Sequence, residues 1–199
     1  MLLYGAGGHG KVVLSCILAS NDPVHAIFDD HHDKAELMGI PVYERYNPDL
    51  FKTESILISV GDNKLRRLIS QKVRHTFGIV RHPSAFTDPD VRIPAGSVLL
   101  HGSIVQTGSV IGQHVIVNTH VSVNHDCVIG DFVHLAPGVV LCGNVHVGAN
   151  TFVGAGTIIT PNLTIGSNCF IAAGSVITNH IPDNSTVRGN PGRIIRTVS

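Results

Sequence analysis

Between Ile93 and Ile177, every sixth residue of the chain is Ile, Leu or Val. The residue four places after each of these is small or β-branched nearly throughout, so each six-residue unit carries two patterned positions. Six is not a helical period, whereas three such units close a triangle of eighteen residues in a parallel β-solenoid. We therefore predict about five stacked coils. The aliphatic positions are Ile93, Leu99, Val105, Ile111, Val117, Val123, Ile129, Leu135, Leu141, Val147, Val153, Ile159, Ile165, Ile171 and Ile177.

Residues 1–85 follow a different pattern, in which short apolar runs alternate with longer amphipathic ones. Strands are expected at 2–4, 25–28 and 55–60, and helices at 11–20 and 64–75, where Leu65, Ile69 and Val73 should face inward. This alternation predicts a small parallel sheet. The predicted fold is an α/β, Rossmann-like subdomain (1–85), an all-β parallel β-helix (86–182) and a C-terminal cap (183–199).

Composition limits the class of protein. Lys plus Arg equals Asp plus Glu, and this balance gives no reason to expect a nucleic-acid partner. No apolar run is long enough to cross a bilayer, and the chain starts without the basic and apolar regions of a signal peptide, which predicts a cytoplasmic protein with no membrane contact. The four cysteines lack CxxC spacing, and we expect them to be reduced.

A glycine-rich turn, GAGGHG, follows the first predicted strand and opens the first predicted helix. Such turns also occur for packing reasons alone, but here Asp29-Asp30 ends the second strand about 20 residues later. A second turn, Gly61-Asp62-Asn63, opens at the same carboxyl edge of the sheet. Amides at helix N-termini bind phosphate. Because 85 residues are few for a full dinucleotide domain, we expect one nucleotide, carried by a sugar, in place of NAD.

Six segments together resemble one family: GAGGHG, FDD, SVGDNKLRR, RHPSA, NHDCVIGDFVHLAPG and GNPGR. The chain is similar along essentially its whole length to bacterial hexapeptide-repeat sugar acetyltransferases. This family contains N-acetyltransferases of UDP-4-amino-sugars and sialic acid O-acetyltransferases. The resemblance implies a left-handed β-helix, a homotrimer with active sites between subunits, and acetyl-CoA as co-substrate without a metal.

The function implied is transfer of acetyl from acetyl-CoA to the 4-amino group of a UDP-linked 4-amino-4,6-dideoxy-N-acetylhexosamine, in surface polysaccharide or glycan synthesis. O-acetylation of a sialic acid is the alternative. Either reaction needs a general base, and histidine titrates near neutrality. By the resemblance the base is His125, oriented by Asp126. Neighbours along a strand point to opposite faces, so Asp126 can reach the ring only where a corner bends the chain.

His134 matches a second family histidine, which contacts the acetyl donor. It lies half a coil from His125, so the two should serve one reaction centre only if they come from different subunits. Asn118 and Gly143 are candidate ligands of the thioester carbonyl or oxyanion. The family matches in the donor groove are Ala155 and Ala173. No Lys or Arg lies between Arg92 and Arg188, so the phosphates of coenzyme A rely on other groups, among them the candidates Arg188, Arg193 and Arg196.

For the acceptor, the resemblance implies that the nucleotide-sugar is bound by residues of the two turns and the acidic pair. Arg66 is a further candidate, as a partner for the diphosphate, although it could equally be an exposed helix charge. The predicted set is Gly7, Gly8, His9, Asp29, Asp30, Gly61, Asn63 and Arg66.

Two other classes of protein are open at this stage. His120 and His125 are five residues apart, a spacing similar to that of zinc ligands in β-helical carbonic anhydrases, but the position two coils before His120 is Ser84 and not a third histidine. A passive binding solenoid is the other alternative. It would favour regular threonine rows, which the threonines of this solenoid do not form.

Overall fold

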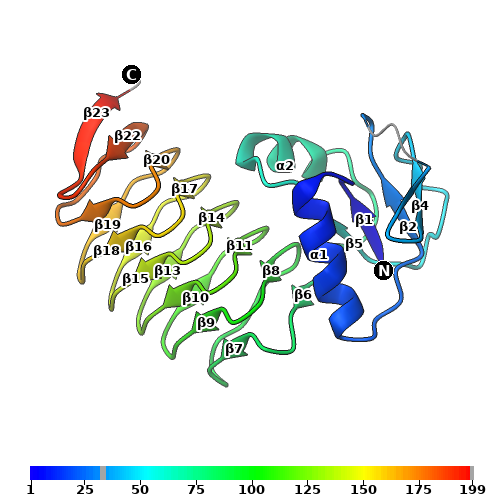
Figure 1. Ribbon diagram of the computed structural model, residues 1–199, viewed down its shortest axis with the longest axis horizontal. Helices are drawn as coiled ribbons and strands as arrows, with labels where there is room; N and C mark the ends of the chain where they lie inside the picture. Colours follow the sequence, from blue (N-terminus) through cyan, green and yellow to red (C-terminus); the bar gives the residue numbers. More distant parts are fainter. Residues whose placement is uncertain (32–34, 198–199) are drawn as a thin grey trace.

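The computed structural model describes residues 1–31 and 35–197, and its two parts follow one another along the long axis (Figure 1). An α/β domain carries the amino terminus, and a parallel β-solenoid extends away from it to the far end, where the chain ends. The predicted fold class is confirmed: an α/β subdomain precedes a parallel β-helix.

The sheet of the α/β domain has the order β3-β4-β2-β1-β5. All of its pairings are parallel except that of β3 with β4. Three strands match the prediction, whereas β3 and β4 were not predicted, because the run that forms β4 is short and contains Pro41. The strands are β1 (Leu2–Tyr4), β2 (Ala26–Phe28), β3 (Glu36–Leu37), β4 (Ile40–Tyr43) and β5 (Ile56–Ile58).

Helix α1 (Gly8–Ala19) lies between the sheet and the first coils of the solenoid. Its residues Val13 and Ile17 belong to one buried cluster that also holds Leu3 of the sheet and Val98 and Ile116 of the solenoid. The two parts of the chain therefore share an apolar core at their junction. Burial of apolar surface stabilises a contact by roughly 25 cal/mol per Å², so this shared core stabilises the junction.

Helix α2 (Asn63–Ser70) begins after Asp62, whose side chain accepts a hydrogen bond from the Leu65 N–H at 2.7 Å and caps the helix. Ile69 is buried, as expected, and Val73 packs partly buried against the same cluster. The inward prediction for Leu65 is wrong, because its side chain is 47% exposed while the neighbouring Arg66 is 0% exposed. The helix is thus turned so that a charged residue, and not leucine, faces the solenoid.

The solenoid has three faces of two-residue strands, in which residues eighteen apart pair in register, as Val117 does with Leu99 and Leu135. One face holds β6 (Val80–Arg81), β8 (Val98–Leu99), β11 (Ile116–Val117), β14 (His134–Leu135), β17 (Phe152–Val153), β20 (Phe170–Ile171) and β22 (Ser185–Arg188). The second holds β7 (Phe86–Thr87), β9 (Ile104–Val105), β12 (Ser122–Val123), β15 (Val140–Leu141), β18 (Ile158–Ile159) and β21 (Val176–Ile177). The third holds β10 (Val110–Ile111), β13 (Val128–Ile129), β16 (His146–Val147) and β19 (Thr164–Ile165).

The aliphatic row fills the interior of the prism, as the pattern predicted. Leu99, Val105, Val117, Val123 and Leu135 are all 0% exposed. Corners are turned by residues in the left-handed region, among them Asn144 and Asn150 but also His120 and Phe132. Histidine and phenylalanine at such corners were not foreseen from composition, because Gly, Asn and Asp are the usual residues with positive φ.

Strand pairing continues beyond both ends of the regular aliphatic row. Strand β6 already pairs with β8, and β7 with β9. The residues in register with the aliphatic row there are Arg81, which is exposed, and Thr87, so the row is broken at this end. At the far end, β22 pairs in parallel with β20 and is covered by the antiparallel strand β23 (Arg193–Thr197). The division into 1–85, 86–182 and 183–199 stays a prediction.

All four cysteines are free thiols, and Cys127 and Cys169 are buried in the solenoid core as expected. Neither helix among the described residues has the length and apolar character needed to cross a bilayer.

Candidate active site

His125 and Asp126 form a corner directly after strand β12. Asp126 has a φ of 60°, so the chain bends there and both side chains turn to the same side. His125 Nδ1 lies 2.8 Å from Asp126 Oδ2. The ionised carboxylate accepts from the Nδ1–H, which leaves the lone pair of Nε2 free. The two side chains are 59% and 65% exposed, so the pair stands open at the surface of the solenoid.

Gly143 lies one coil beyond this corner, directly against the imidazole. A Cβ added at Gly143 would come within 2.5 Å of both Cε1 and Nε2 of His125. Its φ is not in the left-handed region, so the ring, and not the backbone, requires glycine here. The backbone of Gly143 thus packs against the ring of the predicted base. The next residue, Asn144, donates its N–H to the His125 carbonyl at 2.9 Å.

His134 lies on strand β14 and is 8% exposed. Its Nδ1 lies 3.0 Å from the Gly61 carbonyl, which can only accept, so Nδ1 carries the proton. Nε2 therefore accepts from the Asn118 side-chain amide at 3.2 Å. Burial, and secondarily the charge of Arg66, lowers the pKa of His134 to about 4 against the opposing effect of the Gly61 hydrogen bond, so the ring is neutral near pH 7.

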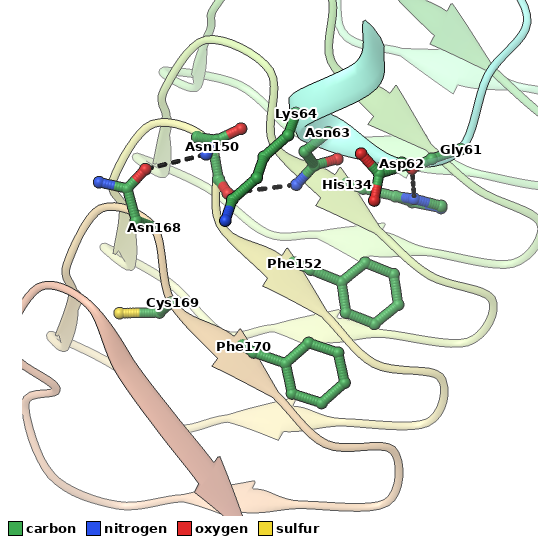
Figure 2. A pocket seen from close by; sticks show the side chains of 10 residues that line it. All are labelled: Gly61, Asp62, Asn63, Lys64, His134, Asn150, Phe152, Asn168, Cys169 and Phe170. Atoms are coloured by element: carbon green, nitrogen blue, oxygen red, sulfur yellow. Dashed lines mark hydrogen bonds between the residues drawn. The ribbon is translucent and has the colours of Figure 1, made fainter. Parts of the chain in front are cut away.

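A junction cavity of about 530 Å³ opens between the start of helix α2 and the solenoid (Figure 2). Gly61 and Asn63 from the turn line one side, and the Asn63 side-chain amide donates to the Asn150 carbonyl at 3.3 Å. His134, Phe152 and Phe170 line the other side, one above the next. The two phenylalanine rings stack at 5.3 Å between centroids.

A second cavity of about 400 Å³, the glycine-loop cavity, lies on the other side of the Gly61 turn. Six of the eight residues predicted to bind the nucleotide-sugar line it: Gly7, Gly8, His9, Asp29, Asp30 and Gly61. A Cβ at Gly7 or Gly8 would meet nothing within 4 Å, so the start of helix α1 is open on this side. Free amides at such a helix start bind phosphate groups.

Gly61 lines both cavities, with His9 in the glycine-loop cavity on one side of it and His134 in the junction cavity on the other. The rings of His9 and His134 are 5.9 Å apart between centroids. Burial, and secondarily the charge of Arg66, lowers the pKa of His9 to about 4. The His9 Nε2 atom is buried and has no hydrogen-bond partner among the described residues. A ligand that spans the two cavities would pass this uncharged pair.

The acidic pair is divided between two tasks. Asp29 accepts from the Ala6 N–H at 2.6 Å and from the His31 N–H at 2.9 Å, so both of its oxygens tie the glycine loop and the strand end together. Among the described residues, Asp30 accepts only from the Tyr4 hydroxyl, at 2.8 Å, and its residue is exposed. Asp30 is therefore the member of the pair with a free carboxylate oxygen at the cavity.

The position of Arg66 agrees with neither prediction made for it, a ligand of the diphosphate or an exposed charge on the helix. It is 0% exposed, so it is not an exposed helix charge, and its N–H groups donate to five protein acceptors, leaving none for a diphosphate. Burial lowers the pKa of its guanidinium to about 10, so it stays charged near pH 7.

The remaining predicted donor ligands, Ala155 and Ala173, are exposed and lie eighteen residues apart at one corner. The described residues contain no group of three or more His, Cys, Asp or Glu that could hold a metal ion. His120 and His125 lie at opposite ends of strand β12 and have no third ligand there.

Sequence reasoning missed Lys64, Phe152, Phe170, Asn150 and Asn168 of the junction cavity. One signal could have found the aromatic pair, because His134, Phe152 and Phe170 follow one another at intervals of eighteen on the outward side of the aliphatic row. Lys64 also lines this cavity from helix α2, so it offers a cation beside a solenoid that has almost none of its own (Figure 2).

Two family profiles match the chain: "PglD N-terminal domain" over residues 1–73 and "Bacterial transferase hexapeptide (six repeats)" over residues 144–179. Among solved structures, the chain is 33% identical to a histidine variant of perosamine N-acetyltransferase from Caulobacter crescentus, in complex with CoA and GDP-perosamine, with a TM-score of 0.91 over 98% of this chain and 96% of that one.

The chain belongs to the bacterial hexapeptide-repeat sugar acetyltransferases. A second structure of this family, the acetyltransferase domain of PglB from Neisseria gonorrhoeae with acetyl coenzyme A, is 35% identical over 98% of both chains, with a TM-score of 0.90. WeeI from Acinetobacter baumannii is 29% identical over 98% of both chains, with a TM-score of 0.85. The chain is thus a sugar acetyltransferase of this family, and acetyl-CoA is its co-substrate.

Proposed function

We propose that this sugar N-acetyltransferase acts on the 4-amino group of a nucleotide-linked 4-amino-sugar, with UDP-linked 4-amino-4,6-dideoxy-N-acetylhexosamine as the first candidate and His125 as the general base. The observation that carries the proposal is the hydrogen bond of 2.8 Å between His125 Nδ1 and Asp126 Oδ2. It leaves Nε2 unprotonated and directed away from the carboxylate, which is the state in which histidine removes a proton.

The step that this base would assist is direct transfer. The sugar amine attacks the thioester carbonyl, a C–N bond forms, and the carbonyl π electrons move to the oxygen of a tetrahedral intermediate. His125 Nε2 takes the proton from the nitrogen, the C–S bond then breaks, and the proton passes to the leaving thiolate to give free coenzyme A. Asp126 stabilises the imidazolium in between. Gly143, which lies against the ring, is the candidate amide for the oxyanion.

A homotrimer, with each site shared by two subunits, fits these positions. His125 follows strand β12 on one face, whereas His134 lies on β14 of another face, next to the glycine loop of its own subunit. On the β12 face, the outward residues Phe86, Ile104 and Ile158 are 55%, 39% and 41% exposed, and this largely apolar row, interrupted by Ser122, is suited to contact a second copy. We propose that His125 of one subunit meets the junction of the next.

The nucleotide would occupy the glycine-loop cavity, with phosphates at the start of helix α1 and the ribose or base near Asp30. Its sugar would then point past the neighbouring rings of His9 and His134 toward the junction cavity. The acetyl donor would approach along the corner of Ala155 and Ala173, where small exposed side chains allow close approach. We place this reaction in the cytoplasm, in the synthesis of a surface glycan.

The proposal is tested by release of coenzyme A thiol from acetyl-CoA with three acceptors in parallel: a UDP-4-amino-4,6-dideoxy-N-acetylhexosamine, GDP-perosamine and sialic acid. Turnover on the UDP-linked amino-sugar is expected. Turnover on GDP-perosamine alone would retain the N-acetyl reaction and correct the nucleotide. Turnover on sialic acid alone would overturn the proposal in favour of O-acetylation.

A further inference from the structure

Arg66 is an arginine without any exposed surface in the middle of helix α2. Its Nε–H donates to the His114 carbonyl at 3.1 Å, and its two terminal nitrogens donate to the Val60, Gly61 and Phe132 carbonyls and to the Asn63 side chain at 2.8 to 3.2 Å. A guanidinium has five N–H donors, so every donor has an acceptor. No carboxylate among the described residues lies within ion-pair distance of it.

These acceptors come from both parts of the molecule. Val60, Gly61 and Asn63 form the turn that separates the two cavities. His114 and Phe132 are solenoid corners one coil apart, both in the left-handed region. The Arg66 side chain therefore fixes the position of this cavity-lining turn relative to the solenoid. Only arginine can do so, because lysine has three donors on a flexible stem and no fixed fork.

The turn held in this way also sets His134. The Gly61 carbonyl accepts from Arg66 at 3.2 Å and from His134 Nδ1 at 3.0 Å, so the same oxygen fixes the ring orientation and tautomer of the histidine. The charge of Arg66 acts on the same rings, since it helps to lower the pKa of His9, His114 and His134, each mainly lowered by burial.

We propose that Arg66 is a positioning residue for the acetyl acceptor: its five hydrogen bonds lock the Val60–Asn63 turn onto the solenoid and so align the nucleotide-sugar with the reaction centre. This rests on the proposed function for the identity of the acceptor. The residue does not touch the ligand. Its effect on the reaction passes through Gly61, Asn63 and His134.

The experiment compares Arg66→Met and Arg66→Lys with Arg67→Met and Arg67→Lys, which make the same changes at the next, exposed helix position. Assays are run well below the melting temperature of each variant. For Arg66→Met we expect KM for the sugar nucleotide to rise at least about tenfold, because several hydrogen bonds to a charged group are lost. KM for acetyl-CoA should rise less than KM for the sugar nucleotide, because His134 is the one predicted donor contact that this turn holds and Ala155 and Ala173 lie elsewhere. Arg66→Lys should be intermediate, and both Arg67 variants should match the wild type.

A pH profile separates positioning from mere stability. Arg66 is the charged group that acts on His9 and His134, Asp62 acts on Arg66, and Asp131 acts on His114. Without the Arg66 charge the pKa of His9 and His134 should rise, and the acidic limb of sugar-nucleotide affinity should move to higher pH in Arg66→Met but not in Arg66→Lys. A loss of active fraction with both KM values and the profile unchanged would overturn the proposal.

Calorimetric binding of UDP and GDP keeps this test independent of the acceptor's identity. If no amino-sugar is turned over but a nucleoside diphosphate binds to the wild type and about tenfold more weakly to Arg66→Met, the proposed function fails and the positioning role stands. If the wild type binds neither nucleotide, or the variant binds as tightly as the wild type, the positioning role is wrong.

Discussion

The two histidines that the sequence singled out lie in opposite settings. His125 stands at an open corner, held by the adjacent Asp126, and its environment comes almost entirely from one short segment and the coil next to it. His134 is buried at the junction, held by Gly61 from 73 residues away and by Asn118. The comparison teaches that the exposed corner leaves the His125 ring accessible, as the proposed general base requires, whereas the buried junction holds His134 neutral and fixed in orientation.

Removal of the proposed base, His125, is expected to have the largest effect. Replacement His125→Ala should lower turnover about 10² to 10⁴-fold, because the amine then has no general base. His120→Ala, at the preceding corner, is the matched control and should retain full turnover. The measurement is kcat from coenzyme A release at saturating substrates. A loss below about tenfold would remove His125 from the role of base.

The buried histidines at the junction should make the free energy of unfolding fall as the pH is lowered. The folded pKa of His9, His114 and His134 is lowered to about 4, mainly by burial, below the 6.5 of the unfolded chain. The unfolded state therefore binds more protons in this range, so their contribution to stability is complete above pH 6.5 and is lost as the pH falls toward 4. Each should reduce the free energy of unfolding by up to about 2 kcal/mol at pH 5.

Urea denaturation at pH 7.5, 6 and 5 measures this loss. His134→Gln should flatten the dependence of the free energy of unfolding on pH, because one fewer imidazole takes up a proton on unfolding. A dependence as steep as that of the wild type would mean that His134 is not held neutral by the fold.

A side chain added at Gly143, which packs against the His125 ring, is expected to lower kcat less than removal of His125. In Gly143→Ala the new Cβ would lie 2.5 Å from His125 Nε2, so the ring must move, and kcat should fall about 10- to 100-fold. Melting temperature should change little, since the backbone conformation of Gly143 suits alanine. Cys142→Ala, one residue earlier, is the control. Full activity in Gly143→Ala would show that the ring is free to swing away without cost.

Asp126→Asn tests the partner of the base. It keeps the size of the side chain but removes the charge that stabilises the imidazolium, and we expect kcat to fall about tenfold, less than for a buried pair because this one is exposed. The bell-shaped pH profile of kcat should shift as well. An unchanged profile would indicate that Asp126 serves only the corner.

The smallest effect separates the two aspartates of the nucleotide site. Asp30→Asn should raise KM for the sugar nucleotide about fivefold with little change in stability. Asp29→Asn should lower the melting temperature as well, because it weakens the bonds to the Ala6 and His31 amides. Equal effects of both changes on stability would contradict the division of tasks between them.

Much of this molecule was readable from the sequence. The period of six located the solenoid core, and residues such as Leu99 and Val117 pair as their spacing requires. The aliphatic row does not extend to Arg81 and Thr87. The pattern therefore did not predict the strand pairings of the first coil. The short strand β4, with Pro41 inside it, carried too little pattern to predict.

The sequence by itself determined the fold class and the inward rows, because these depend on residues one period apart, whereas the bend that brings Asp126 to His125 was seen only in the structure. Only the tertiary structure decided that Arg66 is buried, that Leu65 is exposed and that His134 faces Gly61. Those facts rest on contacts between residues 48, 66 and 73 positions apart, which follow no period. They exist because helix α2 docks on the solenoid, and docking is set by the shape and hydrogen-bonding groups of two surfaces that a local pattern does not describe.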